Sequence, residues 1–225
     1  MLLQPTIIDK RFPNSITSDD MGRIFVGDSM GTLHIWEMVY DNEYKFKKVV
    51  SVTHKKIEGD IINCMSVDPL KKSKLLVHSR DNSIRLLDPF GNQGKLSIET
   101  EYKGLKCSST NLKSVISPDG QFILSGCEEG SPKLWHLLTS FSIDKLICHE
   151  TKFNDFVSDV DWNNNLNMIA VAGFSQEYPV MLYVYEKSAN EINLDLLKMN
   201  MIKNYDNDDE NLNYEDLDNR MKTGS

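Results

Sequence analysis

Short apolar runs, separated by turn-forming residues, recur along this chain at nearly constant intervals. Residues 24–36 read Ile-Phe-Val-Gly-Asp-Ser-Met-Gly-Thr-Leu-His-Ile-Trp, and residues 123–135 read Ile-Leu-Ser-Gly-Cys-Glu-Glu-Gly-Ser-Pro-Lys-Leu-Trp. The same pattern ends at Leu87 and, in a longer version, at Tyr185, so the end positions 36, 87, 135 and 185 are 51, 48 and 50 residues apart. Strand–turn–strand units repeated at this period are typical of β-propeller blades.

The alternation of apolar and polar residues, together with the turn signals, predicts three or four short strands in each repeat. The clearest turn signal is Ser-Pro-Asp-Gly at residues 117–120, where proline presets φ and glycine accepts a positive φ. The predicted strands are 23–27, 32–38 and 46–52; 63–67, 74–78 and 83–87; 112–117, 122–126, 133–138 and 141–148; and 156–162, 168–173 and 180–185.

These strands predict an all-β chain, a β-propeller built from about four blades of four antiparallel strands. The blades are expected at about residues 12–52, 61–104, 110–148 and 153–187. Residues 188–225 hold eight Asn and nine acidic residues against four basic ones, which predicts a mostly disordered acidic tail. Within it, residues 192–202 are more apolar and are expected to dock as a strand or short helix.

Composition limits the classes of partner and compartment. The formal net charge of −8 is unfavourable for binding a phosphate backbone, so no nucleic-acid partner is expected. No apolar run reaches the roughly 18 residues needed to span a bilayer, and residues 1–10 do not read as a signal peptide. Four well-separated cysteines suit a reducing, intracellular setting.

Several stretches resemble the WD-repeat (Trp-Asp) propeller family, over roughly residues 12–187. They are Gly-Thr-Leu-His-Ile-Trp at 31–36, Arg-Asp-Asn-Ser-Ile-Arg-Leu-Leu-Asp at 80–88, and Ser-Pro-Asp-Gly-Gln-Phe-Ile-Leu-Ser-Gly at 117–126 with Lys-Leu-Trp at 133–135. The chain departs from the family because no repeat ends in a literal Trp-Asp and the Gly-His pair is absent. Residues 78–88, 125–130 and above all 173–185 further resemble the later blades of the jouberin family.

The resemblance implies a non-enzymatic protein-interaction scaffold of the ciliary transition zone and basal body, acting in cilium assembly with other transition-zone proteins. The alternative is a generic WD-repeat adaptor, such as a substrate receptor in ubiquitin ligation or a subunit of a trafficking coat. Propellers of this family usually close with seven blades. Four blades therefore leave three explanations open: a piece of a longer chain, a ring completed by another chain, or a small ring closed by this chain alone.

Candidate chemistry is sparse, and we expect no catalytic, cofactor-binding or metal-binding residues. The five histidines never fall at metal-ligand spacing with one another or with cysteine. Asp159 and Asp161 share one face of a predicted strand, where a structural hydrogen bond is favoured over catalysis. Cys127, in a predicted hairpin loop, is the thiol to test for reactivity.

The predicted hairpin turns near residues 28–30, 79–82, 128–131 and 175–178 join corresponding strands, so they should cluster on one face of the propeller. We expect a partner-binding groove there, built from Arg80, Glu128, Glu129 and Gln176. The alternative is that these turns are ordinary solvated hairpins. The expected partners are other proteins, with neither nucleic acid nor direct membrane insertion.

Overall fold

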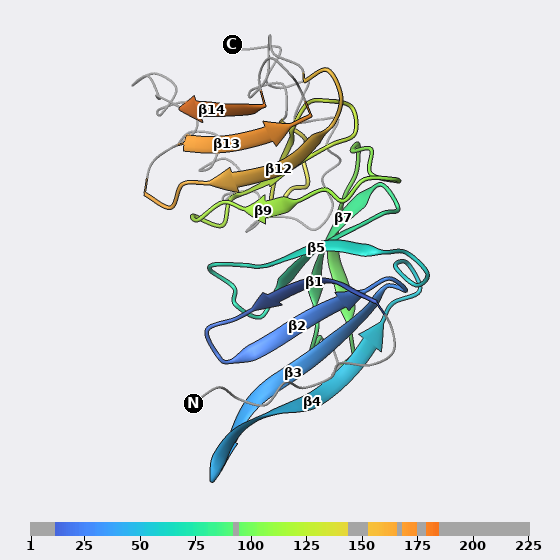
Figure 1. Cartoon of the computed structure of the whole chain (residues 1–225), viewed down its shortest axis with the longest axis vertical. Coiled ribbons are helices and arrows are strands. Elements are labelled where there is room, and N and C mark those ends of the chain that lie inside the picture. Colours follow the sequence, from blue (N-terminus) through green and yellow to red (C-terminus); the bar gives the residue numbers. More distant parts are fainter. Residues whose placement is uncertain (1–11, 92–94, 144–152, 166–167, 175–178, 185–225) are drawn as a thin grey trace, which may run out of the picture. The chain divides into compact units, whose positions relative to one another are not determined.

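The chain is a succession of separate antiparallel β-sheets (Figure 1). The computed structural model describes residues 12–91, 95–143, 153–165, 168–174 and 179–184, and every regular element in these ranges is a strand. By its contacts the chain divides into Met1–Val184, which holds all described strands, and Tyr185–Ser225. Four sheets of three or four strands confirm the predicted all-β fold of successive blades; the number of blades in a closed ring stays a prediction.

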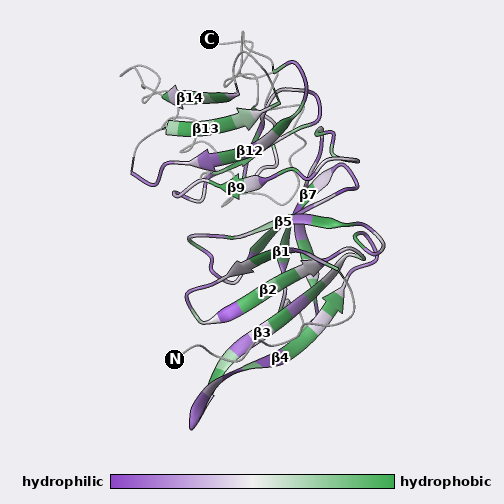
Figure 2. Cartoon of the chain, viewed as in Figure 1, coloured by the Kyte–Doolittle hydropathy of each residue, from purple (hydrophilic) through white to green (hydrophobic). Residues whose placement is uncertain are grey.

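The first two sheets have four strands each, which lie side by side in chain order. They are β1 (Pro13–Ser18), β2 (Arg23–Asp28), β3 (Thr32–Asp41) and β4 (Glu43–Thr53), then β5 (Ile62–Val67), β6 (Leu75–Ser79), β7 (Ser83–Asp88) and β8 (Ser97–Tyr102). Six of these eight strands were predicted, and β1 and β8 were not. The hairpin that joins β3 and β4 has a hydrophilic tip (Figure 2).

The third and fourth sheets have three described strands each. They are β9 (Ser114–Ile116), β10 (Phe122–Ser125) and β11 (Lys133–His136), then β12 (Val157–Trp162), β13 (Met168–Gly173) and β14 (Val180–Val184). The predicted outer strand 141–148 lies largely outside the described residues, although Ser142 forms a bridge with Trp135. The predicted docking segment 192–202 lies outside them entirely.

Apolar side chains are buried between successive sheets rather than within any one of them. Sheets one and two enclose Phe25, Leu33, Ile35, Met65, Leu75, Val77 and Leu87. Sheets two and three enclose Leu76, Ile84, Leu86, Ile116, Ile123 and Trp135. Sheets three and four enclose Leu124, Leu134, Val160, Ile169 and Val171. A blade therefore depends on its neighbours for stability, as in other repeat architectures.

Trp135, at the end of the third repeat, illustrates this packing. The indole is 1% exposed, and its Nε1 donates to the carbonyl oxygen of Lys103 at 3.0 Å. Its ring lies beside that of Tyr102 from the second sheet, whose hydroxyl donates to the Leu137 carbonyl at 2.5 Å. Each aromatic thus has a satisfied polar atom in an apolar setting.

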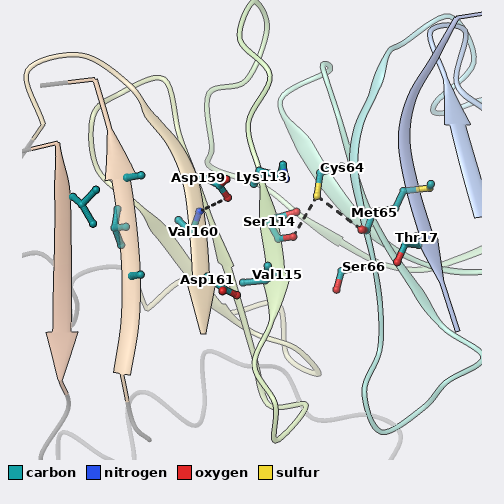
Figure 3. A pocket seen from close by; sticks show the side chains of 14 residues that line it. Thr17, Cys64, Met65, Ser66, Lys113, Ser114, Val115, Asp159, Val160 and Asp161 are labelled. Carbon is teal, nitrogen blue, oxygen red and sulfur yellow. Dashed lines mark hydrogen bonds between the residues drawn. The ribbon is translucent and has the colours of Figure 1, made fainter. Parts of the chain in front are cut away.

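The first strand of each sheet lies against the first strand of the next: β1 against β5, β5 against β9, and β9 against β12. Together these strands line a hollow of about 510 Å³ (Figure 3). The outer strands β4 and β8 each carry a break in register. It falls opposite the step from Ile35 to Trp36 in the first sheet and from Leu86 to Leu87 in the second.

His78, on β6, is a fully buried histidine. It is 0% exposed, and neither ring nitrogen has a hydrogen-bond partner among the described residues. Burial lowers the pKa of His78 from 6.5 to about 4. Between these two values the unfolded chain binds a proton at this residue and the folded chain does not, so acidification destabilises the fold.

We therefore expect the titration of His78 to lower the free energy of unfolding by about 2 kcal/mol as the pH falls from 7 to 5. The variant His78→Leu should lack this loss, since it removes the titrating group and fills a similar volume. Urea unfolding of both chains at the two pH values measures the difference. An equal acid loss in wild type and His78→Leu would contradict the prediction.

Candidate protein-interaction face

Three hairpin turns alternate with the segments that connect one sheet to the next. The first turn is residues 29–31, the second is 80–82 and the third is 126–132; the first connector is 54–61 and the second is 103–113. We call this set of turns and connectors the turn face.

Backbone hydrogen bonds tie each connector to the turns on either side of it. Gly59 N–H donates to the Met30 carbonyl at 2.9 Å, and Arg80 N–H donates to the Ile61 carbonyl at 3.0 Å, so the first connector joins the first two turns. The second connector does the same for the next pair, because Asn82 N–H reaches the Cys107 carbonyl at 3.3 Å and Glu128 N–H reaches the Lys106 carbonyl at 2.9 Å. The turn face is therefore one bonded layer rather than a set of independent loops.

Close approach of turn to connector requires special backbone conformations. Gly31, Asn82 and Gly130 occupy equivalent positions, with φ values of 72°, 62° and 77°. A Cβ atom on Gly31 would overlap the carbonyl of Ile57, and one on Gly130 would overlap the carbonyl of Phe153. Asn82 tolerates this region and uses its side-chain oxygen to accept the Cys107 N–H at 2.8 Å.

A basic residue lies two positions before the end of the repeated pattern in each of the first three blades and pairs with an acid at the adjacent turn. His34 Nε2 lies 3.3 Å from Asp28 Oδ2, and Lys133 Nζ lies 3.5 Å from Glu129 Oε2. In the second blade, Arg85 pairs with Asp81. Each pair joins a strand to the neighbouring turn and so stabilises the hairpin next to the turn face.

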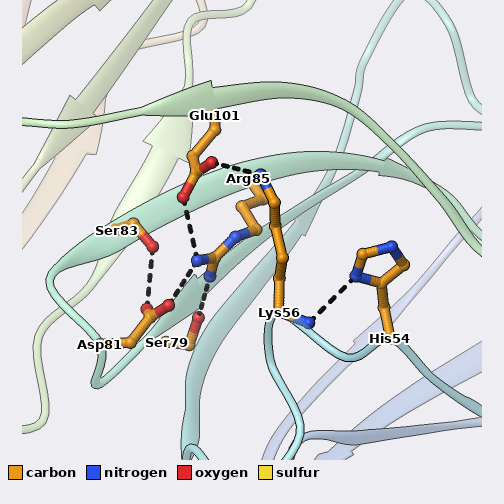
Figure 4. Close-up of polar contacts among 7 residues, drawn as sticks. All are labelled: His54, Lys56, Ser79, Asp81, Ser83, Arg85 and Glu101. Carbon is orange, nitrogen blue, oxygen red and sulfur yellow. Dashed lines mark hydrogen bonds and ion pairs between the residues drawn. The ribbon is translucent and has the colours of Figure 1, made fainter.

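The Arg85 cluster is the most extensive of the three (Figure 4). Its guanidinium is 4% exposed and also contacts Glu101 of β8 at 3.1 Å and the Ser79 hydroxyl at 3.0 Å. Burial acts to raise the pKa of Asp81, but the hydrogen bonds and charge of Arg85 outweigh it and hold that pKa below its usual value. Lys56 of the first connector pairs with Glu101 at 2.9 Å, which joins the connector to the sheet.

Glu128 is held by the second connector. Its carboxylate accepts the backbone N–H groups of Ser108, Ser109 and Thr110 at 3.0, 2.7 and 2.8 Å, and both serine hydroxyls. Burial alone would raise the pKa of Glu128, but these donors lower it to about 2. The carboxylate thus stays charged and fixes the loop in place.

The four residues expected to bind a partner have different surroundings. Arg80 is partly buried, and its Nε donates to Asn63 Oδ1 at 2.9 Å, whereas Glu128 is bound to the second connector. Glu129 is exposed beyond its contact with Lys133, and Gln176 lies outside the described residues. Met30, on the first turn, was not among the predicted residues. Its side chain is apolar and 51% exposed, and an apolar residue in a predicted turn is the sequence signal that could have identified it.

Cys127, the thiol singled out for a reactivity test, lies in the third turn as expected, but the structure buries it. The residue is 0% exposed and packs in the apolar cluster between sheets two and three. It is buried because Glu128 and Lys106 bring the second connector over it, with Lys106 N–H donating to its Sγ at 3.4 Å. Within the described ranges, no group of three or more His, Cys, Asp or Glu side chains could hold a metal ion, and no helix could span a membrane.

Comparison with known proteins shows which proteins this chain is similar to. A family model, the WD domain or G-beta repeat, matches residues 100–136. The chain is similar to jouberin of Rattus norvegicus (24% identity over 212 residues) and of Mus musculus (26% over 209), in each case over 88% of this chain. It spans 19% of the length of each jouberin.

Two further likenesses have narrower scope. WD repeat-containing protein 44 of Xenopus laevis is 32% identical over 99 residues, which cover 44% of this chain and 10% of that protein. The crystal structure of the computationally designed Ika4 protein superposes with a TM-score of 0.58 at 12% identity, covering 83% of this chain and all of that one (100%). At such low identity this likeness concerns the fold alone.

Proposed function

We propose that this chain is a non-enzymatic protein-interaction scaffold that acts at the ciliary transition zone and basal body in cilium assembly. The proposal rests on its match to the WD-repeat model and its similarity to jouberin. The similarity to jouberin over 88% of the chain carries this proposal. WD-repeat domains generally serve as platforms for other proteins, and transition-zone components are the partners that the similarity suggests.

The turn face is the surface we propose for partner binding. It combines a backbone fixed by connector hydrogen bonds with exposed side chains such as Met30 and Glu129. A rigid surface binds with little ordering entropy, which favours specific recognition. We retain Arg80, Glu128, Glu129 and Gln176 as the proposed partner-binding set. Arg80 and Glu128 also hold loops together, so their substitution would disturb the fold as well.

Glu129→Lys is the substitution that separates binding from folding, because its carboxylate is 50% exposed. The tagged full chain, imaged beside a basal-body marker in ciliated cells, should concentrate at the marker. Glu129→Lys should reduce that concentration several-fold at unchanged thermal stability. Glu43→Lys, at the start of β4 and 63% exposed, is the matched control and should behave as wild type.

Localisation also separates the alternative. A chain that stays away from the basal body and instead concentrates on coated vesicles or with ubiquitin-ligase subunits would favour the generic WD-repeat adaptor. That result would overturn the ciliary proposal and leave the fold unaffected.

A further inference from the structure

The hollow between the first strands of the four sheets carries two acidic side chains from one strand. The side chains of Asp159 and Asp161 lie beside β12, toward β9 (Figure 3), while Val160 between them is buried in the core between sheets three and four. Each carboxylate uses Oδ1 to accept the N–H of the next residue at 2.9 Å. In the described part of the chain, neither Oδ2 has a hydrogen-bond or ion-pair partner.

A second polar group lies in the hollow. The hydroxyl of Ser114 on β9 is buried, with the residue 1% exposed, and among the residues that the structure describes its only polar neighbour is the weakly hydrogen-bonding thiol of Cys64. A buried hydroxyl without a strong partner costs free energy, so a ligand atom that bonds to it would be favoured. The lining contains one cation, Lys113, and no salt bridge joins it to either carboxylate among the described residues.

The spacing of the two carboxylates selects the kind of cation. Residues two apart on a strand lie about 7 Å from each other. One metal ion needs more protein ligands than these two carboxylates, and within the described ranges no group of three or more His, Cys, Asp or Glu side chains could hold a metal ion. Two cationic side chains from alternate residues of an extended peptide match the spacing of the carboxylates directly, since they share the same repeat.

We propose that this hollow binds an extended basic segment of a partner protein, with arginine or lysine at two positions separated by one residue. The cations would pair with Asp159 and Asp161, and the backbone or a guanidinium N–H would reach the Ser114 hydroxyl. The net charge of −8 would assist the approach of such a segment. The proposal deepens the scaffold function and rests on it.

A fluorescein-labelled peptide Gly-Ser-Arg-Gly-Arg-Gly-Ser tests the hollow by fluorescence anisotropy with the full chain. We expect the double variant Asp159→Asn/Asp161→Asn to weaken binding at least about tenfold. In an extended peptide, adjacent arginines point to opposite sides. A peptide with adjacent arginines should therefore bind at least about threefold more weakly. Asp155→Asn, an exposed acid just before β12 and outside the lining, should change binding by less than about twofold.

Ser114→Ala adds a readout for the hydroxyl, with an expected weakening of about threefold. Thermal unfolding of each variant establishes that the fold is retained. Wild-type affinity in the double variant, or equal weakening by Asp155→Asn, would overturn the proposal. Basal-body imaging of the same chains separates the two ideas: normal localisation without peptide binding would refute the hollow alone, and peptide binding without localisation would refute the ciliary function alone.

Discussion

Replacing Gly31 by alanine is expected to lower the free energy of unfolding by about 3 kcal/mol or more. Two costs combine: the backbone has a φ of 72°, and the new Cβ would overlap the Ile57 carbonyl of the first connector. Urea unfolding measures the loss. The first connector should also exchange its amide hydrogens faster, because Gly59 N–H would lose its bond to Met30.

Gly59→Ala is the matched control for this experiment. Gly59 has a φ of 88°, but a Cβ there would meet nothing within 4 Å. Its substitution should therefore cost only the backbone strain, about 1 kcal/mol. If both variants lost the same free energy, the overlap at Gly31 would have been relieved by movement of the connector, and the tight joint between turn and connector would be refuted.

Arg85→Met should destabilise the chain by about 3 kcal/mol, because it leaves the partly buried Asp81 without a cation and Glu101 with Lys56 alone. Chemical denaturation at neutral pH measures the loss. Adding Asp81→Asn to Arg85→Met should restore part of it, since the uncompensated charge is then removed.

The equivalent position in the third blade supplies the control. Lys133→Met breaks a pair whose acid, Glu129, is 50% exposed, so the loss should stay below about 1 kcal/mol. A loss for Arg85→Met as small as that for Lys133→Met would show that burial adds nothing to the Arg85 cluster.

The strands that the sequence predicted are those whose alternation or apolar content is strong. β6 and β7 are buried along nearly their whole length, and their residues read as apolar runs around a turn. β1 begins at a proline and is mostly polar and exposed, so neither periodicity nor propensity indicates it. Its pairing with β2 is a tertiary interaction that a local pattern does not encode.

For the turn face, too, a local sequence pattern predicts only part of the structure. That the turns lie near one another follows from the repeated topology, which the sequence predicts. The attachment of Glu128 to Ser108, Ser109 and Thr110 joins residues 18 to 20 positions apart and depends on how blade and connector pack. Burial of Cys127 follows from that packing too, which explains why a thiol in a predicted loop proved inaccessible.

The register breaks in β4 and β8 affect how copies of this chain interact at high concentration. Exposed strand edges invite pairing with another chain, and a bulge is one of the devices that prevent it. Both outer strands carry their irregularity opposite the last step of the repeated pattern, which runs from Ile35 to Trp36 in β3 and from Leu86 to Leu87 in β7. An incoming edge would lose its hydrogen-bonding register partway along, so neighbouring copies at high local density would remain separate molecules instead of merging into a shared sheet.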